Sequence, residues 1–487
     1  MTVFVFSVIM LLSIAIAFYS RRGKDVLNVE EYLVGGRSFS GFLLFFLAVG
    51  EIYSIGTMIG FPGGIYAKGP SYGIWFLGYI LLAYPIGYFL APLIWRVGKK
   101  YGSMTFPDMF RDHYSSRGLE LIVTISALLF MIPWAQLQFE GLVVALSALG
   151  FNLSPIVAVA ISGFLAFLYI YLSGVKAPAL ISVLKDILMF GAILVAGTAV
   201  FMKTDGVSNL FAMAKEQGAS VTIGSSQALL FAMTTIFFQA LAFYCTPAIA
   251  PVIFTGKSEA TIKRTQRFMP LYMFMYPFLI ATAYFSLVAV PNLDDPNHAF
   301  VATVMTLLPS WGIGLVAGGA ALSGTLVLAT YSLAVGGMVS RNLVKNVPES
   351  SQRRWVRIIV FLYLLVSMVL TLVSPSLMVS LINTASAGLG QFLPGLLAIF
   401  FFRKVTPIAI ASGIIAGDLV VMGIYLAGIT LNIHVGLLAL ILNVAVMVVV
   451  TKLTQNKKVI NPVAFQPIEG NVVHDEQKFK NPPIAVE

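Results

Sequence analysis

Two acidic side chains stand inside long apolar stretches of this sequence. Glu51 lies between residues 41 and 65, and Glu140 lies between residues 118 and 148. An ionised carboxylate in such a stretch is costly unless it is paired, solvated or protonated. The two residues therefore predict contact with a cationic ligand, or uptake and release of a proton, against the alternative of a neutral carboxyl group bonded to backbone.

Helix-breaking residues surround the first of these carboxyl groups. The same apolar stretch contains Gly50, Gly56, Gly60, Pro62, Gly63 and Gly64. An interrupted helix leaves backbone groups without partners at membrane depth, and transporters commonly bind an ion or a substrate with such groups. The alternative is a proline kink whose freed groups are satisfied by neighbouring helices. A second interruption follows at residues 244–251.

A third group of small polar residues lies at Ser323, Gly324 and Thr325 in another apolar stretch. A hard cation such as sodium takes oxygen ligands, and carbonyls of a broken helix with a hydroxyl from a facing helix provide them. Small residues also allow helices to pack closely. These residues alone leave both interpretations open.

The composition indicates which kind of protein must position these residues. Of the 487 residues, 59% are hydrophobic and 10% are charged, against about 25% charged in soluble domains. The mean hydropathy of +0.92 requires apolar stretches along the whole chain, which excludes a soluble protein with a single anchor. We expect thirteen transmembrane helices, at residues 2–20, 41–65, 72–95, 118–148, 155–174, 178–202, 226–253, 270–290, 311–339, 355–374, 378–402, 406–428 and 432–452.

The basic residues predict the orientation in the lipid bilayer. Clusters of Lys and Arg fall in every second loop along the chain, and the first of them contains Arg21 and Arg22. Loops that are rich in Lys and Arg are cytoplasmic. Of the 30 Lys and Arg residues, only Lys68, Lys203 and Lys215 are expected on the other side. This places the N-terminus outside and residues 454–487 in a cytoplasmic tail. It also places no Lys or Arg in the middle of the membrane. Because the basic residues lie in these loops, the net charge of +10 does not indicate a nucleic-acid-binding protein.

The two interrupted helices each open a unit of five spans. The first unit covers residues 41–202 and the second covers residues 226–402. An odd number of spans reverses the second unit, so the pattern predicts inverted repeats. Residues 1–40 would add an extra helix and an amphipathic segment, residues 406–453 two peripheral helices, and residues 454–487 the tail.

Several segments resemble the sodium/solute symporter family. EYLVGGRS at residues 31–38, MIGFPG at 58–63 and YGSMTFPD at 101–108 are similar to the lead-in to the first core helix, the break after it, and the first inner loop. The strongest match is GLGQFLPG at residues 388–395, followed by FRKVT at 402–406 and small residues up to Gly417. The resemblance implies an all-α fold of the leucine-transporter type and sodium-coupled symport of a small organic solute across the cell membrane.

The resemblance also implies the positions of the sodium ligands. Backbone carbonyls would come from Gly50, Tyr53 and Ala321, while Gly324 and Thr325 take the places of two hydroxyl residues. Gly324 offers only its backbone, and an alignment shifted by one residue would place Ser323 at a ligand position. Ser182 stands where some members have a carboxylate for a second sodium ion, so we expect one cation per cycle.

The solute would bind near the middle of the membrane. The resemblance places Ser54, Gln138, Gln239, Phe243 and Ser386 there, and Glu140 joins them as a substrate contact, with Glu51 as the coupling residue. The expected absence of a central Lys or Arg favours a cationic, zwitterionic or neutral solute. The alternatives are a proton-coupled symporter that uses Glu51 and Glu140, and a nutrient sensor. We expect neither an enzyme nor a cofactor other than sodium, and the oligomeric state stays open.

Overall fold

The computed structural model describes residues 1–21, 28–148, 154–344, 347–454 and 461–465. Arg22 and nearly all of the expected tail lie outside the described residues. Twelve helices in the described part are long and apolar enough to span a membrane, and the bent pair Gly41–Ile52 and Gly56–Lys68 makes a thirteenth if it is counted as one span. All thirteen expected spans correspond to these helices.

The continuous spanning helices are long and begin at the expected places. They are α1 (Thr2–Ser20), α5 (Pro70–Tyr101), α7 (Arg117–Ser147), α8 (Pro155–Ser173), α9 (Lys176–Lys203), α16 (Ser310–Met338), α17 (Glu349–Val373), α20 (Pro407–Leu426) and α21 (Val435–Leu453). Short helices connect them: α2 (Val29–Val34), η1 (Gly35–Arg37), α6 (Phe106–Tyr114), α10 (Val207–Glu216), η5 (Pro296–His298), α15 (Ala299–Leu307), η6 (Val339–Leu343) and η8 (Val463–Phe465).

The first predicted break is present in the span of residues 41–68. Ser40 caps α3 (Gly41–Ile52), which ends at Tyr53, where the backbone leaves the helical region. A π-helical turn, η2 (Gly56–Gly60), and α4 (Phe61–Lys68) complete the span after a bend of 42°. The carbonyl groups of the last turn of α3 therefore lack the amide donors that a continuous helix would supply.

The second predicted break also occurs. α11 (Ser226–Ala242) passes into a short 3-10 segment, η3 (Phe243–Cys245), and the chain becomes extended at Thr246 before α12 (Ile249–Phe254). Tyr244 and Cys245 are buried in this break. Tyr244 packs its hydroxyl end against Gly87 of α5, where a side chain would collide with it.

One span differs from the prediction at residues 270–290. Its helix begins earlier, as α13 (Glu259–Phe268). The chain then changes to the 3-10 segment η4 (Met269–Met275) and returns to α-helix in α14 (Tyr276–Ala289). The predicted start was wrong because the polar face of α13 interrupts the apolar pattern that marks a span. Another interrupted span contains α18 (Met378–Leu389), η7 (Gly390–Phe392) and α19 (Leu393–Phe401).

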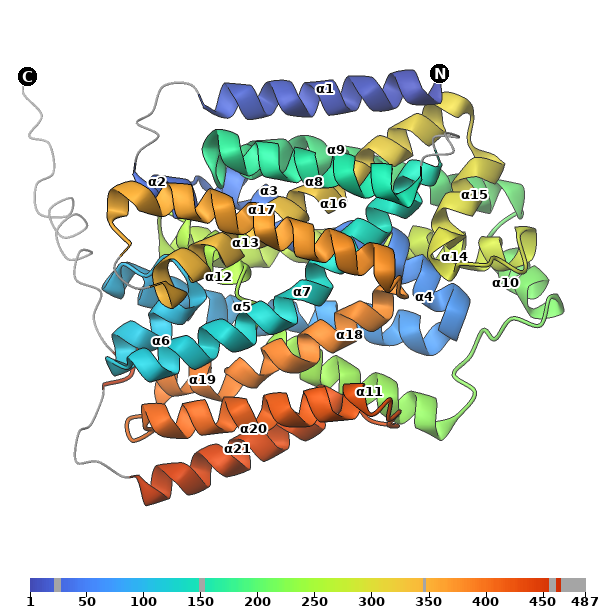
Figure 1. The fold of residues 1–487 in the computed structure, drawn as a ribbon. Coiled ribbons are helices and arrows are strands. Elements are labelled where there is room, and N and C mark those ends of the chain that lie inside the picture. Colours follow the sequence, from blue (N-terminus) through green and yellow to red (C-terminus); the bar gives the residue numbers. More distant parts are fainter. Residues whose placement is uncertain (22–27, 149–153, 345–346, 455–460, 466–487) are drawn as a thin grey trace, which may run out of the picture.

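The helices pack around α16, which is buried over most of its length. It contacts α1, α7, α8, α9 and α17. Figure 1 shows α1 along one edge of the molecule and the pair α20 and α21 along the opposite edge, with the broken helices between them. This arrangement brings the break of α3 close to α7, α9 and α16.

Candidate functional site

A cavity of about 500 Å³, part of it open to solvent, lies between the two helix breaks. Its wall combines a few polar groups with aromatic and aliphatic side chains from α3, α5, α7, α11, η3, α12, α16 and α18. The lining residues are Glu51, Ile52, Tyr79, Trp134, Gln239, Ala242, Phe243, Thr246, Ile249, Tyr331, Ile382, Ser386 and Leu389.

Glu51 is the acidic group of this cavity. Its side chain is almost fully buried, and its Oε2 atom has no hydrogen-bond partner among the described residues. Thr330 of α16 and Lys185 of α9 lie near it. The carboxyl group therefore faces a cavity with an acceptor free, as expected of a group that meets a ligand.

Gln239 and Ser386 contribute the neutral polar groups. Gln239 donates a hydrogen bond from Nε2 to Asn383 Oδ1 over 2.7 Å, and His434 lies on the other side of the amide. Ser386 donates to the Ile382 carbonyl over 2.7 Å, so its oxygen still accepts a hydrogen bond. Both side chains are held at the cavity wall by neighbours on α18 and α21.

Trp134 lies across the cavity on α7. Its indole Nε1–H is buried and has no acceptor in the described part of the chain, and its ring lies 5.8 Å from that of Tyr331 between centroids. The cavity thus has an unpaired donor on Trp134 and an unpaired acceptor on Glu51.

Ser54 and Gln138 lie outside the cavity lining. Ser54 accepts a hydrogen bond from the Gly56 amide over 3.1 Å, which stabilises the break itself. Gln138 is fully buried on α7, and neither of its amide atoms has a partner among the residues described.

Glu140 is held away from the cavity by the loop between α17 and α18. Its Oε1 accepts a hydrogen bond from the Ser376 amide over 3.0 Å, and Gln136 donates to the Ser374 carbonyl over 2.6 Å. These contacts fit the alternative of a carboxyl group bonded to backbone. Sequence reasoning could not separate Glu140 from Glu51, because both stand in similar apolar surroundings along the chain.

The residues expected to bind sodium lie at the break of α3 and on α16, a helix that contacts α3. Gly50, Tyr53, Ala321 and Gly324 are all buried, and Gly324 packs closely against Leu142. Ser323 donates its hydroxyl to the Gly319 carbonyl over 2.8 Å. Thr325 Oγ1 is buried and lacks a partner within the described ranges, so its hydroxyl is free to coordinate.

Lys185 corrects the expectation that no basic residue lies in the middle of the membrane. It is fully buried on α9, its Nζ donates to the Tyr53 carbonyl over 3.0 Å, and it forms an ion pair with the buried Asp186. The charge pattern placed this lysine at an inner helix end, but it lies ten residues into the 28-residue helix α9. The sequence did contain a signal for this buried ion pair, because two adjacent charged residues stand between the apolar Leu184 and Ile187.

Two further cavities continue from the central one. The first shares Glu51, Ile52, Phe243 and Ile249 with it and reaches Gln266. The second shares Val252 with the first and reaches Thr105 and Gly337. Together they lead from the middle of the protein toward the face that carries Arg111, Arg117 and Arg341.

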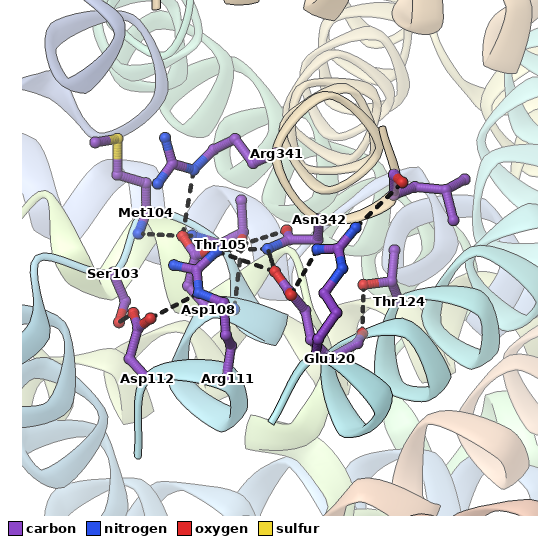
Figure 2. A network of polar contacts seen from close by, with 12 residues as sticks. Ser103, Met104, Thr105, Asp108, Arg111, Asp112, Glu120, Thr124, Arg341 and Asn342 are labelled. Atoms are coloured by element: carbon purple, nitrogen blue, oxygen red, sulfur yellow. Dashed lines mark hydrogen bonds and ion pairs between the residues drawn. The ribbon is translucent and has the colours of Figure 1, made fainter. Parts of the chain in front are cut away.

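A polar network borders this inner end (Figure 2). Asn342 of η6 donates from Nδ2 to Asp108 Oδ1 and Glu120 Oε1, over 2.7 Å each. Arg111 Nη1 lies 3.1 Å from Asp108 Oδ1, and Arg341 Nε lies 3.3 Å from Asp108 Oδ2. Burial alone would raise the pKa of Asp108, but the two guanidinium groups and donated hydrogen bonds hold it below its usual value. The network ties α6 and the start of α7 to the end of α16.

Comparisons with known proteins agree with this architecture. Residues 32–417 match the sodium:solute symporter family. A monocarboxylate transport permease protein of Rhizobium johnstonii is 28% identical, with 90% of this chain and 93% of the relative covered. The uncharacterized symporter YhjB of Bacillus subtilis is 26% identical, with 92% and 96% covered, and a sodium/proline symporter of Staphylococcus aureus is 23% identical, with 97% and 96% covered.

Solved structures confirm the predicted fold class. A sodium-coupled sialic acid symporter superimposes with a TM-score of 0.74 at 14% identity, covering 94% of this chain and 98% of the other. A nucleobase-cation-symport-1 family transporter gives a TM-score of 0.52 at 14% identity, covering 88% and 97%. The protein is an all-helical multi-pass membrane protein and a transporter rather than an enzyme. The family match covers most of its length and confirms the resemblance of its segments: the chain belongs to the sodium:solute symporter family.

Proposed function

We propose that the protein is a secondary active symporter that carries a small zwitterionic solute, such as an amino acid, through the central cavity by alternating access. The observation that carries this proposal is the pair of unpaired buried polar atoms on one cavity, Glu51 Oε2 and Trp134 Nε1. A buried polar atom without a partner is costly, so each favours a ligand that completes its hydrogen bonding.

Glu51 Oε2 would bind a hydrogen-bond donor of the solute, whereas Trp134 Nε1 would bind an acceptor. Glu51 offers an acceptor that a solute ammonium group would satisfy, whereas the Trp134 indole offers a donor to a solute carboxylate. The hydroxyl of Ser386 and the amide of Gln239 lie on the same wall. The aromatic rings of Tyr79, Phe243 and Tyr331 provide the apolar remainder of the site.

A monocarboxylate is the second candidate solute. It is favoured by the name of the Rhizobium permease, which aligns with 90% of this chain. The correction at Lys185 also removes one reason for preferring a cation, because a basic group does lie near the cavity. A carboxylate without an ammonium group would use Trp134 and leave the Glu51 oxygen without a partner.

Family membership makes sodium the expected coupling ion, with Gly50, Tyr53, Ala321, Gly324 or Ser323, and Thr325 as the proposed ligands. The alternative retains proton coupling, with Glu51 as the group that takes up the proton. Cell-membrane localisation, an outside N-terminus and a cytoplasmic C-terminus complete the proposal.

The experiment measures uptake of radiolabelled proline, alanine, lactate and choline into proteoliposomes. Glu51→Gln should raise the KM for the amino acid at least tenfold, because a charge-assisted hydrogen bond contributes about 1.5–3 kcal/mol. Trp134→Phe should weaken transport of every solute that carries a carboxylate. Glu140→Gln and Trp311→Phe are the matched controls, since these side chains lie away from the cavity lining.

The pattern of losses discriminates between solutes. Lactate uptake that survives Glu51→Gln, with no amino-acid uptake in the unsubstituted protein, would select the monocarboxylate. Saturable binding without uptake of any of the four solutes would select the sensor. An equal loss on Glu51→Gln and Glu140→Gln would remove the central cavity as the solute site.

A further inference from the structure

Lys185 places a positive charge where few membrane proteins tolerate one. Lys185 is the tenth of the 28 residues of α9, inside a helix that is long and apolar enough to span a membrane. Its side chain has no exposed surface. A charge at this depth is expensive and needs specific partners.

The partners of Lys185 are those of a bound cation. Its Nζ donates to the Tyr53 carbonyl over 3.0 Å, and it pairs with the carboxylate of Asp186. Nζ also lies 3.5 Å from the position that a Cβ of Gly50 would occupy. Gly50 and Tyr53 supply the carbonyl groups of the interrupted last turn of α3, and the partial negative charge of a helix C-terminus attracts a cation.

The facing helix completes the same surroundings. Leu188, one turn beyond Lys185, packs its backbone against Gly319 of α16, two residues before Ala321. Thr325 on α16 holds a buried hydroxyl oxygen without a partner among the described residues. The lysine ammonium therefore stands beside the proposed sodium ligands on α3, and its helix packs against α16, which carries the others.

The charges around Lys185 fix its electrostatics. On α9, the facing charged group is Asp186; on α3 the titratable groups are Glu51 and Tyr53; and on η4 the ring of Tyr272 lies beside Asp186. The sequence of α16 contains no charged residue, and its titratable group near Glu51 is Tyr331. A second cation at the Tyr53 carbonyl would repel the ammonium at close range in a medium of low dielectric constant.

We propose that the ammonium group of Lys185 is the resident cation at the break of α3 and occupies the place that a sodium ion would take, so that sodium binds there only when Lys185 has been replaced. The proposal rests on the transport function but replaces the sodium site proposed above at Gly50 and Tyr53, and sodium binding is measured without a solute.

The test measures sodium-dependent thermal stabilisation of the purified full-length protein in detergent, with choline chloride replacing sodium chloride at constant ionic strength. A cation that binds the folded state raises its apparent stability. At pH 7 the unsubstituted protein should show no sodium-specific shift. Lys185→Ala should acquire a saturable shift in Tm, because it frees the Tyr53 carbonyl and leaves the Asp186 carboxylate as a further ligand.

Two control variants define the specificity of this gain. Lys185→Arg keeps a cation at this position, so it should show no sodium shift. Lys203→Gln removes a charge from the last residue of the same helix and should behave as the unsubstituted protein. If Lys185→Ala fails to fold, Lys185→Met, which keeps a long side chain without its charge, should show the sodium shift instead.

A sodium shift in the unsubstituted protein at pH 7 that is equal in Lys185→Ala would overturn the proposal and make Lys185 a structural residue. The absence of any sodium shift in Lys185→Ala, in a protein that folds, would overturn it as well. Failure of solute uptake in proteoliposomes is a separate result: it removes the transport proposal and leaves the sodium-binding measurement as it stands.

Discussion

His113 shows how strongly burial can act on one residue outside the spanning helices. The side chain lies on α6 beside Tyr114, with its Nδ1 atom 3.1 Å from the Tyr101 hydroxyl. It is only 5% exposed. Burial, with the nearby charge of Lys100, lowers the pKa of His113 to about 4, so the imidazole is neutral at pH 7.

The depressed pKa predicts a loss of stability in mild acid. The unfolded chain takes up a proton at His113 near pH 6.5, whereas the folded chain resists it down to about pH 4. The contribution is therefore complete above pH 6.5 and is lost as the pH falls toward 4, at most about 3 kcal/mol. His113→Phe should flatten the Tm profile between pH 6.5 and 4.5, measured by thermal unfolding in detergent.

His298→Phe is the control for this measurement, because this histidine lies in η5 before α15 and its ring is about one third exposed. An unchanged slope in His113→Phe would assign the acid sensitivity of the protein to other groups.

The sequence identifies candidate site residues by their chemical type, but it does not show which side chains surround them in the fold. Glu51 and Glu140 were found because carboxyl groups are rare in apolar stretches, yet only one of them lines the cavity. Lys185 was missed because a rule about loop charges assigned it to a helix end. Which side chain meets a cavity depends on contacts between helices far apart in the chain, and no local pattern contains them.

At the scale of elements, the inner network joins parts of the molecule that a transport cycle would separate. Asp108 closes a capping box with Thr105 at the start of α6, and the same carboxylate accepts from Asn342 on η6. Because η6 continues α16, this contact fixes the helix that carries Thr325 to the inner ends of α6 and α7. The cavity that reaches Thr105 and Gly337 ends beside it.

Replacing the buried carboxylate should weaken this connection. Asp108→Asn leaves the guanidinium groups of Arg111 and Arg341 without their shared partner. The cost should be on the order of 3 kcal/mol, as for other buried ion pairs that lose one member. We expect a lower Tm and faster thiol labelling of a cysteine introduced at Gly337.

Asp112→Asn is the matched control, because this carboxylate pairs with Arg111 but is 21% exposed. Equal effects of the two substitutions would show that the network acts through its total charge, and the proposed role of the Asp108–Asn342 contact would then be wrong.

The broken helices were the most predictable elements. Glycine and proline at residues 50–64 and prolines at 247 and 251 disrupt a helix locally, so the sequence itself marks both breaks. The interruption at η4 was not predicted. Its residues, MPLYMFM, are mostly apolar and contain one proline, and the segment contacts α5, α9 and α14, which are distant or separate elements that no local pattern reveals.

On the scale of the whole molecule, one feature is the separation of charge between its two ends. The inner network and the exposed Lys257 lie at helix ends that are rich in arginine, whereas Asp294 follows α14 at the other end of the spans. The charge rule makes the arginine-rich end cytoplasmic. The direction of the inner cavities then corresponds to an opening toward the cytoplasm.

This orientation is tested by labelling in intact cells with an impermeant thiol reagent. In a Cys245→Ser background, a cysteine at Asp294 should react from outside, and one at Lys257 should react only after the membrane is permeabilised. Both positions are exposed, so access to the protein surface does not limit either reaction. The reverse pattern would invert the proposed topology and place the N-terminus inside.

Cys245 has a practical consequence of its own. It is the single cysteine of the 487 residues, and it is fully buried in η3 at the second helix break. A buried thiol reacts only while its surroundings are open. The native chain therefore contains one spectroscopic attachment point, whose modification rate measures the frequency at which this break opens. Solutes and ions can then be ranked by how they change that rate, with no engineered label and before the transported solute has been identified.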